Sequence, residues 1–123
     1  MKKIFSIAFI ILFFAISANA QNTFQFTSVK HNFGKIKQSV PVSYTFLFKN
    51  ISNKPLIVEV ATAECGCTTP DYPKEPITKG KDGKIKVTFN AESAGTFSKK
   101  VTVKFANVDD PVILTIEGEV IGK

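Results

Sequence analysis

The chain has 123 residues, of which 44% are hydrophobic, and a formal net charge of +6. Every basic residue is a lysine, and the chain contains neither arginine nor tryptophan. Base and phosphate recognition depends heavily on the bidentate arginine side chain. The lysines are also interspersed with acids, as around Asp82, which is typical of a solvated surface. We therefore expect no nucleic-acid partner.

The N-terminal segment has the three parts of a secretory signal peptide in the usual order. Lys2 and Lys3 precede an apolar run, residues 4–16, that only Ser6 interrupts, and small residues follow at 18–20. The run is shorter than the roughly 20 residues that a membrane span needs. We expect cleavage after Ala20 and export to the periplasm or the medium, the alternative being an N-terminal membrane anchor.

Residues 21–123 then form the mature chain, which is long enough for one domain and too short for two. Without Lys2 and Lys3 its charge is +4. We expect no membrane span in this part.

Apolar and polar residues alternate with a period of two along the mature chain, which is typical of strands with one buried face. The first short strand contains Phe24 and Phe26, and residues 31–36 are expected to bend and then return to extended structure. Later apolar series are Val42, Tyr44, Phe46, Phe48; Leu56, Val58, Val60; Ile85, Val87, Phe89; Phe97, Val101, Val103, Phe105; and Val112, Leu114, Ile116, Val120.

Turns rich in Asn, Asp, Pro or Gly separate these series at 50–55, 91–95 and 107–111. Residues 65–82 contain three prolines and are predicted to be a long loop. The pattern predicts an all-β fold, an immunoglobulin-like antiparallel sandwich of about seven strands. A small closed barrel is the alternative architecture.

A series of short motifs also resembles one known family. The motifs are His31-x-Phe33-Gly34-x-Ile36, Tyr44-x-Phe46-x-Phe48-x-Asn50, Pro55-Leu56, Cys65-Gly66-Cys67-Thr68, Lys79-Gly80, Val87-x-Phe89, Gly95-x-Phe97 and Ile116-x-Gly118-x-Val120. Together they resemble the secreted bacterial family catalogued as domain of unknown function 1573, which is related to the immunoglobulin-like domains of the ASPM, SPD-2 and hydin group. The Cys-Gly-Cys-Thr tetrad is the most specific motif. The resemblance implies a sandwich fold and export, but no activity.

Cys65 and Cys67 are the only cysteines, and an exported pair is first read as a disulfide. We expect Gly66 to let the backbone bend tightly enough to close it. The loop closed is so short that the bridge would stabilise the fold by only about 1.6 kcal/mol. The pair is therefore either a local structural clamp or chemically active.

Two chemical roles remain open for this pair. One is thiol–disulfide exchange, although the usual redox spacing is Cys-x-x-Cys at the start of a helix. The other is binding of Cu(I) by the two thiolates. His31, the only histidine, would be the third ligand if its bend lay beside the cysteines. A lone histidine at a bend more often hydrogen-bonds the backbone than binds a metal.

We expect no enzymatic activity and no cofactor, because no Gly-x-Ser-x-Gly, phosphate loop or His-Glu-x-x-His is present. The leading hypothesis is an immunoglobulin-like binding or scaffolding module. Its protein partner would contact an exposed edge strand or the 68–82 loop through Thr68, Tyr72 and Pro73. The prolines of that loop would alternatively only stiffen it. The second hypothesis is a redox or Cu(I)-handling accessory protein that uses Cys65 and Cys67.

Overall fold

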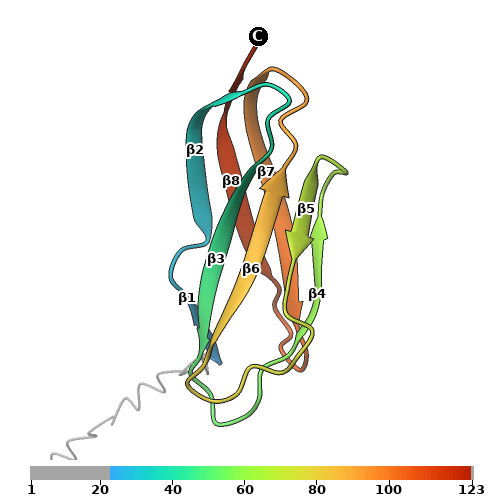
Figure 1. The fold of residues 1–123 in the computed structure, drawn as a ribbon. Helices are drawn as coiled ribbons and strands as arrows, with labels where there is room; N and C mark the ends of the chain where they lie inside the picture. Colours follow the sequence, from blue (N-terminus) through green and yellow to red (C-terminus); the bar gives the residue numbers. More distant parts are fainter. Residues whose placement is uncertain (1–22, 123) are drawn as a thin grey trace, which may run out of the picture.

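A computed structural model describes residues 23–122, which form two β-sheets packed face to face (Figure 1). The predicted signal peptide lies outside the described residues. The eight strands are β1 (Phe24–Phe26), β2 (Lys30–Lys37), β3 (Val42–Asn50), β4 (Val58–Ala63), β5 (Thr68–Asp71), β6 (Asp82–Phe89), β7 (Gly95–Phe105) and β8 (Val112–Ile121). This architecture confirms the predicted all-β sandwich.

The strand order is β1-β3-β6-β5 in one sheet, called sheet A, and β2-β8-β7-β4 in the other, called sheet B. The chain passes from sheet A to sheet B between β1 and β2 without reversing its direction. In sheet A, β1 pairs antiparallel with β3, whereas in sheet B, β2 pairs parallel with β8. The prediction of a purely antiparallel sandwich was therefore wrong for this one pair.

The segment predicted to bend at 31–36 is β2, which contains a bulge. Its register with β8 shifts between Asn32 and Lys35. Gly34 has φ +70, and its N–H donates to Asn32 Oδ1 at 2.7 Å. The glycine thus supplies the left-handed conformation that a bulge of this kind requires.

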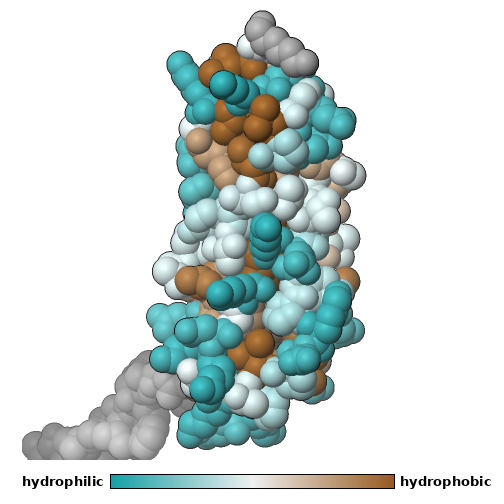
Figure 2. Space-filling model, viewed as in Figure 1, coloured by the Kyte–Doolittle hydropathy of each residue, from teal (hydrophilic) through white to brown (hydrophobic). Residues whose placement is uncertain are grey.

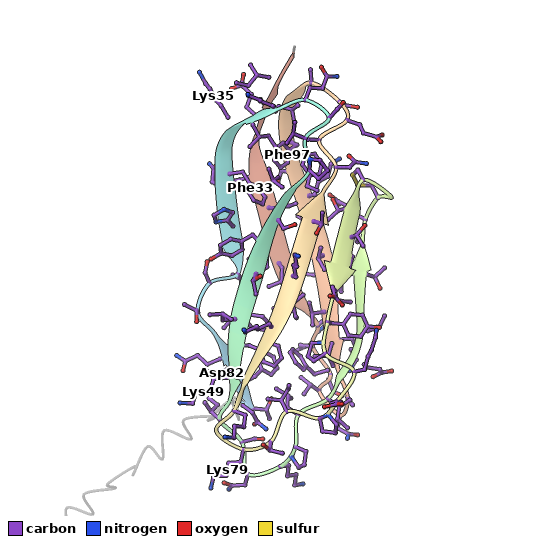
Figure 3. All side chains as sticks on the ribbon, viewed as in Figure 1. Phe33, Lys35, Lys49, Lys79, Asp82 and Phe97 are labelled. Atoms are coloured by element: carbon purple, nitrogen blue, oxygen red, sulfur yellow. A yellow bond between two sulfur atoms is a disulfide. The ribbon has the colours of Figure 1, made fainter. Side chains whose placement is uncertain are left out.

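The inward residues of the two sheets form one core, as the alternation predicts. Its fully buried side chains include Phe46, Phe48, Ile85, Val87, Val101, Val103, Phe105, Leu114 and Ile116. Phe33 of β2 and Phe97 of β7 lie in the upper part of the molecule (Figure 3), where both pack against this core. Hydrophobic surface is also visible at that end, where the β2–β3 and β6–β7 connections come together (Figure 2).

Val60 was predicted to face the core, but it is 40% exposed. The register between β4 and β7 shifts between Val58 and Val60, and Ala61 takes the inward position beyond this bulge. One extra residue reverses the faces of the residues after it, because side chains alternate with a period of two. The described residues contain no helix that could cross a membrane.

The segment 65–82 was predicted to be entirely loop, and this prediction was wrong at its start. Thr68–Asp71 forms β5, the edge strand of sheet A, which pairs antiparallel with β6. Pro70 is tolerated there because an edge strand needs donors on one side only. The remaining connection to β6 is residues 72–81.

Candidate interaction site

His31 and the two cysteines lie at opposite edges of the sandwich. His31 is on β2, at one edge of sheet B, whereas the cysteines follow β4 at the other edge. The imidazole stacks on the Tyr44 ring, with 3.7 Å between centroids and 7° between planes. The structure therefore does not support His31 as a third ligand for Cu(I). Residues 23–122 contain no cluster of three or more His, Cys, Asp or Glu side chains placed to hold a metal ion.

Cys65 and Cys67 lie at disulfide-bonding distance, with their Cα atoms 5.3 Å apart. They occupy the turn by which the chain crosses from β4 in sheet B to β5 in sheet A. On the sheet A side, Asn90 N–H donates to Cys67 O at 3.0 Å. On the sheet B side, Glu64 N–H donates to Lys100 O at 3.3 Å. The pair thus lies in a crossover between the sheets, the position in which a local structural clamp, one of the roles open from the sequence, would act.

Gly66 was expected to be needed for this bend, but the structure gives no conformational reason for it. Its φ is not in the left-handed region, unlike that of Gly34, Gly80 and Gly95. A Cβ at position 66 would also have no heavy atom within 4 Å. An alanine should therefore be accommodated in this turn.

The predicted contact residues Thr68, Tyr72 and Pro73 do not share one environment. Thr68 is buried, with 4% exposure, and its hydroxyl lies 3.6 Å from Cys67 Sγ, so it cannot reach a partner. Tyr72 and Pro73 are half-buried and line a pocket of about 460 Å³ on the outer face of sheet A. Lys74 Nζ lies 3.5 Å from the centroid of the Tyr72 ring and covers part of it. Of the three predicted contact residues, only Tyr72 and Pro73 are therefore accessible to a partner.

A second feature lies beside the disulfide turn, along the upper part of β7. This strand pairs with β8 from Gly95 to Val103, but β4 pairs with it only from Val101 onward. In Figure 1 the upper part of β7 accordingly extends beyond the end of β4. Among the strands of residues 23–122, the stretch Gly95–Lys99 thus has a neighbour on one side only.

The backbone of this stretch presents its polar groups to the open side. Lys100 O accepts a hydrogen bond from Glu64, so Lys100 directs its backbone toward β4. Because this direction repeats every second residue, Ser98 and Thr96 direct their N–H and C=O groups the same way. Both residues are exposed. These groups form a template onto which another strand could pair.

A groove of about 400 Å³ adjoins this free edge. Its lining residues are Cys67, Phe89, Asn90, Glu92, Ser93, Ala94, Gly95, Thr96, Phe97, Ser98 and Lys99. The Phe89 and Phe97 rings stack in its floor at 4.1 Å between centroids. The groove therefore combines backbone donors and acceptors, an apolar floor and one wall formed by the disulfide turn.

The groove was not predicted from the sequence, because it depends on which strands are neighbours. A signal was available, since the alternation predicts a strand of 97–105 but only a short series at 56–60. A long strand beside a short one leaves part of its edge unpaired.

The family described as protein of unknown function (DUF1573) matches residues 24–120 of this chain. No curated protein sequence matches this chain. The match confirms the resemblance found in the sequence motifs.

Solved structures share the fold at low sequence identity. A protein of unknown function from Porphyromonas gingivalis W83 matches with TM-score 0.69 and 12% identity over 80% of this chain and 46% of its own. This chain thus spans less than half of that protein. PapD-like domain 7 of human CEP192 matches with TM-score 0.70 and 7% identity over 82% and 87%. The YadV chaperone matches with TM-score 0.56 and 15% identity over 81% and 53%. The VesB protease and the secreted serine protease VesC of Vibrio cholerae contain a similar fold as well.

Proposed function

Since the chain belongs to the DUF1573 family and has an immunoglobulin-like fold, we propose that it is an exported, non-enzymatic module that binds an extended segment of a partner protein. The segment would add as a strand to the free edge of β7. The observation that carries this proposal is the unpaired stretch Gly95–Lys99 beside the groove. Strand addition takes its affinity from backbone hydrogen bonds and its selectivity from neighbouring side-chain sites.

Features that discourage strand addition are present at two other edges. The β5 edge is short and contains Pro70, which cannot donate a hydrogen bond. The β2 edge contains a bulge and the exposed lysines Lys30, Lys35 and Lys37. Bulges, prolines and lysines are the usual means by which sheets prevent unwanted pairing. The exposed backbone at Thr96 and Ser98 has neither a bulge nor a proline, and the one charged residue of the stretch Gly95–Lys99 is Lys99 at its end.

The similarity to a PapD-like domain and to the YadV chaperone supports a binding role, although fold alone assigns none. The side chains of the groove also favour binding over catalysis. His31 is stacked on Tyr44 at the opposite edge, so it cannot act as a base beside Ser98.

Proline at position 98 should block binding at this edge. Ser98→Pro removes the outward N–H and places the ring where an added strand would lie. Peptides selected by display on the mature chain should bind this variant at least about tenfold more weakly than wild type, because the ladder of hydrogen bonds is broken. Affinity is measured by fluorescence anisotropy with labelled peptides.

A matched control is Thr45→Pro, on the other partly unpaired strand. β1 covers only Phe48–Asn50 of β3, and the Thr45 N–H is directed to the uncovered side. This variant should retain wild-type affinity. If every selected peptide bound Ser98→Pro as tightly as wild type, the proposal would be wrong.

Export and the disulfide are tested together by mass spectrometry of the protein expressed with its own N-terminus. We expect recovery from the periplasm or medium of a chain that begins at Gln21 and is lighter by two hydrogens than the reduced form. The bridge should withstand mild reductant, because Cys67 is half-buried in a turn tied to both sheets. Rapid exchange with glutathione would instead favour the thiol-redox function.

A further inference from the structure

Lys99 is an inward-facing lysine at the free edge of β7. In the register with β8, Lys99 lies opposite the buried Ile116, as Val101 lies opposite the buried Leu114. Its side chain therefore starts on the core face of the sheet. Lys99 is half-buried and lines the groove together with Cys67 and Phe97. A cation in such a position is one that an anionic ligand group would stabilise.

The ammonium group of Lys99 has no carboxylate partner among residues 23–122. The one ion pair within 4.0 Å in this part of the chain joins Lys30 to Glu117, on the opposite side of sheet B. Glu92 is the acidic side chain that lines the groove, but it is exposed on the β6–β7 connection and does not pair with Lys99. The groove thus keeps a positive charge beside an apolar floor.

An added strand would place its own side chains opposite Lys99 and Phe97, so the groove should prefer certain residues at those positions. A segment that continues the line of β4 runs antiparallel to β7. Its residues opposite Lys99 and Phe97 then have side chains on the same inward face, about 5 Å away between Cβ atoms. In antiparallel pairing the residue opposite Phe97 comes two positions after the residue opposite Lys99. The complementary pair is an acid opposite the lysine and an apolar residue opposite the phenylalanine.

We infer that the groove selects an extended protein segment that contains an acidic residue followed, two positions later, by a large apolar residue. This inference rests on the proposed function, because it assumes strand addition at β7. The chain itself shows a carboxylate at the same edge, where Lys100 N–H donates to Glu64 Oε1 at 3.1 Å. The partner's acid would lie opposite Lys99, the residue that precedes Lys100 in β7, beside the disulfide turn.

The test uses three synthetic peptides of eight residues that alternate threonine with apolar residues. In the first, consecutive inward positions are glutamate and then phenylalanine. The second has glutamine in place of glutamate, and the third has the two inward residues in reversed order. The mature wild-type chain should bind the first peptide about tenfold more tightly than the other two at low salt, because charge complementarity and order both contribute. The preference should shrink as salt rises.

Variants of Lys99 test whether this side chain recognises the acidic residue of the bound peptide. Lys99→Gln should bind the glutamate and glutamine peptides equally, and Lys99→Glu should prefer a lysine-containing analogue, which a structural defect would not produce. Lys84→Gln, at an exposed position of β6, should keep the wild-type preference. The inference fails if wild type binds the glutamate and glutamine peptides equally while Ser98→Pro weakens both. The proposed function itself fails if Ser98→Pro weakens neither these nor the display-selected peptides.

Discussion

Gly83→Ala should lower the free energy of unfolding by roughly 3 kcal/mol, at the upper end of what overpacking a core costs. Gly83 is buried on β6 and lies directly opposite Phe48 of β3. An alanine Cβ there would lie 2.6 Å from both Cε atoms of the Phe48 ring and closer still to its Cζ. The ring is 1% exposed and cannot move into solvent without leaving the core. The loss should appear in urea unfolding as a lower midpoint with an unchanged slope.

Two further variants identify the ring as the cause. Gly66→Ala, where a Cβ meets nothing within 4 Å, should be neutral or slightly stabilising, since alanine lowers the entropy of the unfolded chain. Phe48→Leu should be less harmful in the Gly83→Ala background than in wild type, because the smaller side chain makes room for the methyl group. Additive effects of the two substitutions would show that Phe48 does not occupy the space above Gly83.

The pairing of Phe48 with Gly83 also shows how far the sequence specifies the fold. The alternation in β3 and β6 marks Phe46, Phe48, Ile85 and Val87 as inward, and all four are buried. The alternation fails at Val60, because a bulge is a two-strand event that leaves no trace in the local pattern of one strand. β5 was missed because its four residues include Pro70, and its pairing with β6 is long-range.

The candidate site was harder to predict than the core for the same reason. The sequence identified the cysteines that form one wall of the groove, but not the edge beside them. That edge exists because β4 ends at Ala63 while β7 begins at Gly95, far above the end of its neighbour (Figure 1). Likewise, only the register with Ile116 shows that Lys99 faces inward, and only the strand order of residues 23–122 shows that it lies at an unpaired edge. Local periodicity gives the face of a residue and not the neighbours of a strand.

Asn50→Ala should also cost roughly 3 kcal/mol, since it removes all four hydrogen bonds of a fully buried side chain. Asn50 is fully buried at the end of β3. Its Nδ2 donates to Lys54 O at 2.7 Å and to Ile77 O at 2.8 Å. Its Oδ1 accepts from Ser52 N–H at 2.9 Å and from Ser52 Oγ at 2.7 Å. One side chain therefore holds both the β3–β4 turn and the loop that follows β5.

Ile77 belongs to the loop that also contains Tyr72. Asn50→Ala should therefore loosen this loop locally, in addition to lowering the free energy of unfolding. Asn50→Ala should speed tryptic cleavage within residues 72–81, at Lys74 or Lys79, under conditions where wild type remains folded. Asn53→Ala, at an exposed position of the same turn, should change neither stability nor cleavage. The stability and cleavage rate of Ser52→Ala should lie between those of the other two variants. This substitution removes the hydroxyl but keeps the backbone N–H that donates to Asn50 Oδ1. If Asn50→Ala unfolded at a lower urea concentration without faster local cleavage, Asn50 would support the β3–β4 turn alone, and the 72–81 loop would be held by the backbone pairing of Leu56 with Ile77.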